Sequence, residues 1–174
     1  MRVFMPYLAA IALTGSAFAQ DPGASAPCDA PGYHQFDFWI GDWEVTSPDG
    51  VVQGRNVITA EESGCLIVER WVSSAGDTGQ SYNFYDPATD KWRQVWVSTG
   101  AIIDYEGGLT ETGSMKLEGT ITYQNGAATA PFFGEWTSNE DGSVTQHFEQ
   151  YSEEKGEWGV WFTGIYRRAE SDQL

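Results

Sequence analysis

The chain has 174 residues, and its 25 Asp and Glu against 9 Lys and Arg give a formal net charge of −16 at pH 7. Such an acidic surface repels the phosphates of nucleic acids and of anionic lipids, so we expect neither as a partner. The length suits one domain with a proper core and is too short for two.

The N-terminal residues 1–19 have the pattern of a secretory signal peptide. Arg2 precedes an apolar run from Val3 to Leu13, and small residues ending in Ala17-Phe18-Ala19 follow. The apolar run is shorter than the ~20 residues that a membrane-spanning helix needs, and an Ala-x-Ala cleavage site comes after it. We therefore expect cleavage near Ala19, no membrane span, and export to the periplasm or the extracellular space.

Residues 20–31 are rich in Pro, Ala and small polar side chains, which predicts a flexible leader before a domain that occupies residues 32–170. The two cysteines, Cys28 and Cys65, both belong to the exported part, where thiols oxidise. We predict a disulfide between them. Neither lies near a candidate base or a redox motif, which argues against a catalytic cysteine.

The stretch from Phe36 to Val45 contains four aromatic residues. Its alternation predicts a first strand over residues 38–47, with a short helical turn before it within residues 32–37. Trp39 and Trp43 share a parity, so in an extended segment they point to one face. Two large indole rings on one face indicate that this face lies in the interior.

The rest of the chain shows unbroken β patterning. Apolar or aromatic alternation recurs over residues 51–59, 65–73, 80–86, 91–98, 101–105, 114–123, 131–138, 143–151 and 157–167, with turn residues between. About ten short strands joined by tight turns leave no room for parallel crossovers. We therefore expect an all-β fold, an antiparallel up-and-down β-barrel of about ten strands, because closure removes the sheet edges.

Aromatic residues share a face in three of the later strands, which predicts one interior lined by large rings. The pairs are Trp92 with Trp96, Phe132 with Trp136, and Trp158 with Phe162.

Gly41-Asp42-Trp43, on a first strand after a helical turn, resembles the Gly-x-Trp signature of the lipocalin-like (calycin) barrels. In those barrels a basic residue of the last strand packs over the Trp, and Arg167 or Arg168 stands at that place here. The resemblance implies that Trp43 and this arginine close one end of the barrel as a structural element, and we assign the role to Arg167.

A closer resemblance is to a group of exported bacterial proteins of unknown function with this barrel. Their opening motif, Phe-Asp-Phe-Trp-Ile-Gly-x-Trp, is present here as Phe36 to Trp43. Their further motifs occur as Gly64-Cys65-Leu66 with Glu69 and Trp71, as Ser81 to Pro87, and as Trp92 to Val97. This resemblance implies the barrel fold and an exported location, and it supplies no activity.

Polar side chains recur beside tryptophans in the middle strands, which nominates a ligand site. Glu69 and Trp71 share a face of one strand, Asn83 lies on the next, and Gln94 and Trp96 share a face of the one after. If these five residues face the interior, they form a hydrogen-bonding cluster in an aromatic cavity, the usual composition of a ligand pocket. We expect a small apolar or aromatic ligand there, and no metal or cofactor. The alternative is a barrel that its own rings fill and that acts through its outer surface.

A cavity enzyme is a second alternative. It would use Glu69, whose pKa burial among rings would raise, with His147, Tyr85 or Asp104 as a second proton carrier in isomerase, cyclase or hydratase chemistry. The sequence has no Gly-x-Ser-x-Gly nucleophile elbow, and spacing fixes no pair of titratable groups. Binding is therefore favoured over catalysis.

Haem is a third alternative. Some haem-binding members of the broader barrel class hold iron through one histidine on a late strand, and by that resemblance His147 would be the ligand. A lone histidine is more often a surface or hydrogen-bonded residue, which weighs against this reading. The sequence leaves the identity of the ligand and the oligomeric state open.

Overall fold

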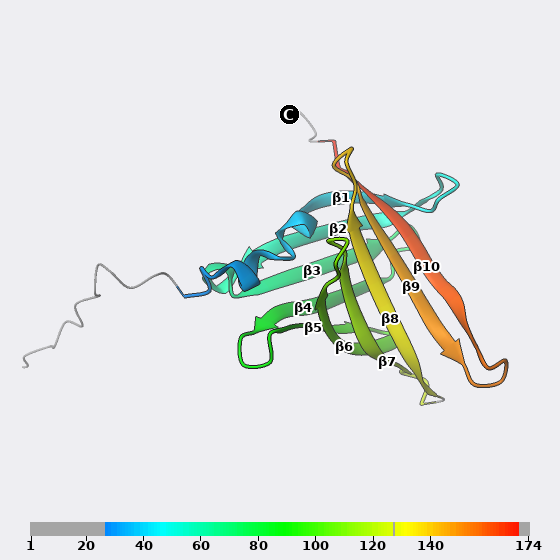
Figure 1. Cartoon of the computed structure of the whole chain (residues 1–174). Helices are drawn as coiled ribbons and strands as arrows, with labels where there is room; N and C mark the ends of the chain where they lie inside the picture. Colours follow the sequence, from blue (N-terminus) through cyan, green and yellow to red (C-terminus); the bar gives the residue numbers. More distant parts are fainter. Residues whose placement is uncertain (1–26, 127, 171–174) are drawn as a thin grey trace, which may run out of the picture.

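The structure is a computed structural model, and it describes residues 27–126 and 128–170. The described residues form ten strands that pair antiparallel in chain order and close into a barrel, because β1 pairs with both β2 and β10 (Figure 1). The all-β class and the up-and-down topology are therefore confirmed. The strands are β1 (Gly41–Thr46), β2 (Val52–Glu61), β3 (Leu66–Ser73), β4 (Thr78–Asp86), β5 (Lys91–Ser98), β6 (Ala101–Leu109), β7 (Met115–Tyr123), β8 (Thr129–Ser138), β9 (Val144–Ser152) and β10 (Glu157–Arg168).

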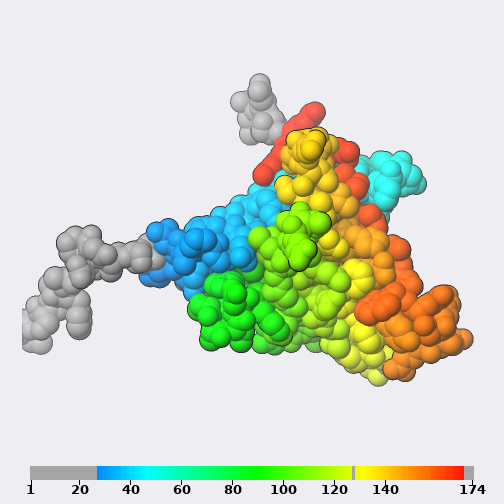
Figure 2. Space-filling model, in the orientation of Figure 1, coloured from blue at the N-terminus to red at the C-terminus, as the bar shows by residue number. Residues whose placement is uncertain are grey.

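Short 3-10 helices accompany the barrel: η1 (Pro31–His34), η2 (Asp37–Trp39) and η3 (Glu62–Gly64). Figure 1 shows the first two, in blue, at one end of the barrel, and Figure 2 shows them packed directly against the neighbouring strands. The predicted strand over residues 38–47 is wrong at its start. Trp39 N donates to Phe36 O at 3.1 Å and Ile40 N donates to Asp37 O at 3.0 Å, so this segment turns and β1 begins only at Gly41.

The helical turns place large rings inside the end of the barrel. The ring of Phe36 stacks on Trp39 with centroids 4.9 Å apart, and it lies 5.2 Å from Trp136 of β8 and 5.7 Å from Trp92 of β5. All four side chains are buried. We call Phe36, Trp39, Trp92 and Trp136 the aromatic plug, because they close this end of the barrel to water. Trp43 donates its Nε1 proton to Trp39 O at 2.8 Å and so ties β1 to the plug.

The arginine over Trp43 is Arg168, so the assignment to Arg167 is wrong by one residue. The Arg168 guanidinium lies 3.9 Å from the Trp43 ring centroid, and its Nη1 donates to Ile40 O at 2.8 Å. The register explains the difference, since Arg168 lies opposite Trp43 whereas Arg167 lies opposite Glu44, one position along and on the other face. A side chain at Gly41 would collide with the guanidinium, because its Cβ would lie 1.6 Å from Nη1 of Arg168.

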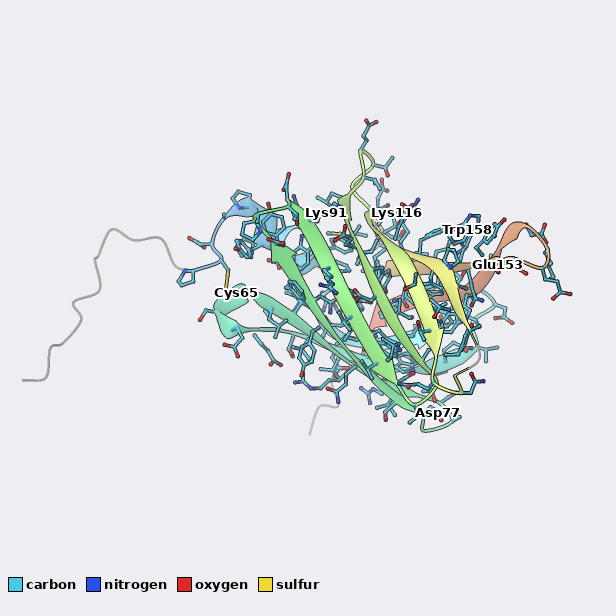
Figure 3. The ribbon with its side chains drawn as sticks, turned by 90° about the horizontal axis from the view of Figure 1, so that it is seen from below. Cys65, Asp77, Lys91, Lys116, Glu153 and Trp158 are labelled. Atoms are coloured by element: carbon cyan, nitrogen blue, oxygen red, sulfur yellow. A yellow bond between two sulfur atoms is a disulfide. The ribbon has the colours of Figure 1, made fainter. Side chains whose placement is uncertain are left out.

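The predicted shared face of Trp158 and Phe162 is also wrong, because a β-bulge separates them. The pairing of β10 with β9 shifts between Val160 and Phe162, and Trp161 is the extra residue. Trp158 consequently lies on the outside, 44% exposed, with its ring 5.3 Å from Phe133 (Figure 3). Phe162 packs against the core from within.

The predicted disulfide between Cys28 and Cys65 is present and joins the segment before η1 to the start of β3 (Figure 3). A disulfide fits an oxidising location. The predicted signal peptide and residues 20–26 of the predicted leader lie outside the described residues. No helix within the described ranges is long and apolar enough to span a membrane.

We expect Arg168→Ala to lower the free energy of unfolding by about 2 kcal/mol, because it removes a cation–π contact and a charged hydrogen bond. Arg167→Ala is the matched control and should change stability by less than about 0.5 kcal/mol, as is usual for an exposed position. Guanidinium chloride unfolding followed by tryptophan fluorescence measures both values. Equal losses for the two variants would contradict the role given to Arg168.

Candidate functional site

The barrel contains a cavity of about 160 Å³ that is open on one side and lies away from the aromatic plug. This volume is close to the roughly 150 Å³ of an engineered apolar protein cavity that takes up benzene. Six of the lining side chains are apolar or aromatic: Trp71, Trp96, Ile103, Phe148, Trp161 and Phe162. Five are polar or carry a hydroxyl: Glu69, Gln94, Tyr105, Gln146 and Tyr166.

The cavity is polar at its floor and aromatic towards its opening. The five polar lining side chains are all at most 4% exposed, whereas Trp161 is 46% exposed and Trp71, Trp96 and Phe162 are half-buried. Tyr166 touches the closed end of the barrel, since its ring centroid lies 6.5 Å from Trp39 and 6.2 Å from Trp43. A ligand entering past Trp161 would therefore meet rings first and hydrogen-bonding groups last.

The strand register brings the polar side chains together. Glu69 on β3 lies opposite Ser81 on β4. Two residues further along β4, Asn83 lies opposite Gln94 on β5, and Gln94 lies opposite Tyr105 on β6. Directly opposed residues point to the same face of a sheet, so alternation within each strand sends all five side chains inward.

Glu69 is a carboxyl group buried in the barrel, 4% exposed. Asn56 Nδ2 of β2 donates to Glu69 Oε1 at 2.7 Å, and Ser81 Oγ donates to Glu69 Oε2 at 2.6 Å. Burial raises the pKa of Glu69 from its ordinary 4.5 to about 7, although the hydrogen bonds from Ser81 and Asn56 oppose the rise by stabilising the charged form. The cavity thus contains a carboxyl group that changes charge near neutral pH.

Hydrogen bonds extend from Glu69 in both directions around the barrel. On one side the Tyr105 hydroxyl donates to Gln94 Oε1, Gln94 Nε2 donates to Asn83 Oδ1, and Asn83 Nδ2 donates to Ser81 Oγ at 2.9 Å. In each of these three hydrogen bonds the acceptor is the group nearer to Glu69 in the series. Asn83 is held further by a 3.0 Å bond from its Nδ2 to Ile67 O.

On the other side Asn56 Nδ2 donates to the Tyr166 hydroxyl at 3.1 Å, and that hydroxyl donates to Gln146 Oε1 at 2.8 Å. This series of hydrogen bonds links residues of seven strands, β9, β10, β2, β3, β4, β5 and β6, and we call it the polar belt. Its members are Tyr105, Gln94, Asn83, Ser81, Glu69, Asn56, Tyr166 and Gln146.

The two tyrosines of the polar belt keep their protons at neutral pH. Burial raises the pKa of Tyr105 and of Tyr166 well above 10, and the negative charge of Glu69 raises both further. Glu69 is consequently the lining group that titrates in the neutral range.

Four of the five residues predicted to bind a ligand line the cavity: Glu69, Trp71, Gln94 and Trp96. Asn83 faces inward but does not line the cavity. It accepts a hydrogen bond from Gln94 and donates one to Ser81. Sequence reasoning missed Asn56, Tyr105, Gln146, Tyr166 and Trp161. The parity of Tyr105 with Ile103 was a usable signal, whereas the bulge that turns Trp161 inward leaves none in the sequence.

The residues predicted as second proton carriers lie apart from Glu69. His147 faces outward, with Nδ1 2.9 Å from Thr163 Oγ1 and Nε2 3.0 Å from Glu149 Oε1. The Tyr85 hydroxyl donates to Asp90 at 2.6 Å, and Asp104 pairs with Arg93 at 2.7 Å. None of the three lines the cavity. The haem alternative stays a prediction, and no histidine is among the residues that line the cavity.

Within residues 27–126 and 128–170 no group of three or more His, Cys, Asp or Glu side chains is placed to hold a metal ion. A scan against protein-family models and a search of curated proteins found no match to this chain. The ten-strand antiparallel barrel is consistent with a lipocalin-like fold.

The buried carboxyl predicts a specific pH dependence of stability. Below pH 4.5 Glu69 is protonated in both the folded and the unfolded chain, and between 4.5 and about 7 the folded chain holds the extra proton. Its contribution to the free energy of unfolding therefore falls as the pH rises through this window, by on the order of 3 kcal/mol. Glu69→Gln lacks this loss, so the stability of the wild type relative to the variant should decline from pH 4.5 to 8.

Glu61→Gln is the control, because its carboxylate lies outside and behaves oppositely. Hydrogen bonds from Thr59 and Arg70 lower the pKa of Glu61, so its charged form stabilises the fold and that contribution is lost as the pH falls. Urea unfolding at a series of pH values measures both differences. A wild-type stability that keeps a constant offset from Glu69→Gln would show that Glu69 is not shifted.

Proposed function

We propose that the barrel binds one small apolar or aromatic molecule in the cavity whose floor is formed by Glu69 and other members of the polar belt. We propose further that the protein acts as an exported carrier or sensor. The observation that carries this proposal is a hollow of about 160 Å³ walled by rings and provided with few, convergent polar groups. Ligand pockets generally have this composition.

The charge of the site restricts the ligand. The chain has a formal net charge of −16, and a carboxylate stands in the cavity wall whenever Glu69 is ionised. An anionic ligand would meet repulsion both outside the barrel and within it. The proposal is therefore confined to neutral or cationic molecules.

Two features support export. The disulfide between Cys28 and Cys65 fits an oxidising compartment, and the sequence of residues 1–19 has the pattern of a signal peptide. With the opening motif from Phe36 to Trp43, they support membership of the exported bacterial barrel group described above.

A second candidate is acid–base catalysis in the same cavity, and the observation that favours it is the raised pKa of Glu69. Isomerisation or hydration needs a proton to be removed at one atom and delivered at another. Glu69 could do the first, but both nearby tyrosines hold their protons far above neutral pH. Binding is therefore the better-supported function.

Filling the cavity tests the proposal. Ile103 is 2% exposed and lines the cavity, so Ile103→Phe should occupy its space and weaken binding of toluene at least tenfold. Ile102→Phe, next in sequence but 37% exposed on the outside, should bind toluene like the wild type. Tryptophan fluorescence reports binding, because Trp71, Trp96 and Trp161 line the cavity.

Saturable binding of one toluene per chain, lost in Ile103→Phe alone, is the expected result. Absence of saturable binding to the wild type, or equal binding to both variants, would contradict the proposed site.

A further inference from the structure

The floor of the cavity contains a buried side chain with one unused polar group. Gln146 is 4% exposed and lines the cavity. Its Oε1 accepts a hydrogen bond from the Tyr166 hydroxyl at 2.8 Å, whereas its Nε2 has no hydrogen-bond partner among the described residues. Nε2 is not one of the fully sealed unpaired atoms, which are Trp39 Nε1, Asn56 Oδ1 and Trp136 Nε1 in the described structure, so a molecule in the cavity can reach it. Such a donor favours any molecule that can accept a hydrogen bond from it.

The orientation of Gln146 follows from the charge on Glu69. An ionised carboxylate only accepts hydrogen bonds, so Asn56 must turn its Nδ2 towards Glu69. The same Nδ2 donates to the Tyr166 hydroxyl, and Asn56 Oδ1 is left buried without a partner in the described structure. The Tyr166 hydroxyl has one proton to donate and directs it at Gln146, so Gln146 must present Oε1 to Tyr166, which leaves its Nε2 outside this chain of hydrogen bonds.

The other polar groups of the lining are already engaged. Gln94 uses its Oε1 to accept from Tyr105 and its Nε2 to donate to Asn83. Glu69 accepts a hydrogen bond on each of its oxygens, from Asn56 and from Ser81. Among the side chains that line the cavity, the group for which the described structure provides no partner is therefore a hydrogen-bond donor, the Gln146 amide.

The geometry points to a neutral aromatic carbonyl compound of about the size of benzaldehyde as the ligand, with its ring among the aromatic walls and its oxygen accepting a hydrogen bond from Gln146 Nε2. The cavity of about 160 Å³ has space for one ring with a small substituent. A ligand carboxylate could also accept this hydrogen bond, but it would bring a second negative charge beside Glu69. This inference rests on the proposed function and adds the chemical class of the ligand.

Benzaldehyde, styrene and benzylamine provide the test. The first two have nearly the same shape, but only benzaldehyde carries a hydrogen-bond acceptor. Benzylamine carries a positive charge, which the Glu69 carboxylate would favour if it selected the ligand. At pH 8 in a buffer without amines, benzaldehyde should bind the protein roughly three- to tenfold more tightly than styrene and more tightly than benzylamine. Chemical-shift titration of ¹⁵N-labelled protein gives the three dissociation constants.

Gln146→Met should reduce the ratio of the styrene and benzaldehyde constants to about one. Gln150→Met is the matched control. Gln150 is on the same strand and also accepts a tyrosine hydroxyl, from Tyr123 at 2.5 Å, but it does not line the cavity. It should keep the wild-type ratio.

A second readout needs no substitution. In the wild type, the side-chain amide protons of Gln146 should move further downfield with benzaldehyde than with styrene, because both ligands bring a ring current but only benzaldehyde accepts a hydrogen bond. Equal affinities for benzaldehyde and styrene, with the same shift of the Gln146 amide for both, would overturn the assignment and leave the binding function standing. Tighter binding of benzylamine would overturn it in favour of selection by Glu69. Failure of all three to bind would overturn the proposed function itself.

Discussion

The interior of this barrel depends on one costly feature, the burial of the Glu69 carboxyl group among aromatic rings. Removing a carboxylate from water costs several kcal/mol unless hydrogen bonds compensate it. The structure supplies those bonds from Asn56 and Ser81, which are positioned in turn by Tyr166 and by Asn83. The polar belt can therefore be understood as the set of donors and acceptors that one buried charge requires.

The closed end of the barrel makes this burial possible. The aromatic plug and the stacked pair of Trp43 and Arg168 exclude water beneath the belt, so Glu69 remains in surroundings of low polarity. On the other side of the barrel, the β9–β10 hairpin projects away from the helical turns (Figure 2). The bulge at Trp161 in β10 turns this ring towards the cavity while Trp158 stays outside. One end is thus sealed, and the other is bordered by half-exposed rings.

The sequence predicted those parts of the structure that depend on local alternation. The strands, their order and the inward direction of Glu69, Trp71, Gln94 and Trp96 all follow from a period of two residues and from tight turns. It could not predict what depends on register between strands. The choice of Arg168 over Arg167 is a difference of one residue, and the bulge reverses the faces of Trp158 and Phe162.

The polar belt was also beyond prediction, except for its middle part. Asn83 and Gln94 are neighbours on adjacent strands, and each carries a recognisable polar signal beside tryptophans. Gln146, Tyr166 and Asn56 come from opposite ends of the chain and meet only because β10 closes onto β1. Such a contact has no signature within any one strand, so it appears only once the barrel is closed.

The most direct test of this account is the ionisation of Glu69 itself. In protein labelled with ¹³C at glutamate side-chain carboxyl carbons, one resonance should titrate with a midpoint near pH 7 and should be missing from Glu69→Gln. That result would establish the buried charge around which the cavity is arranged. A Glu69 resonance that titrates at the ordinary value of 4.5 would contradict the account, because it would mean that the carboxyl group is in contact with water.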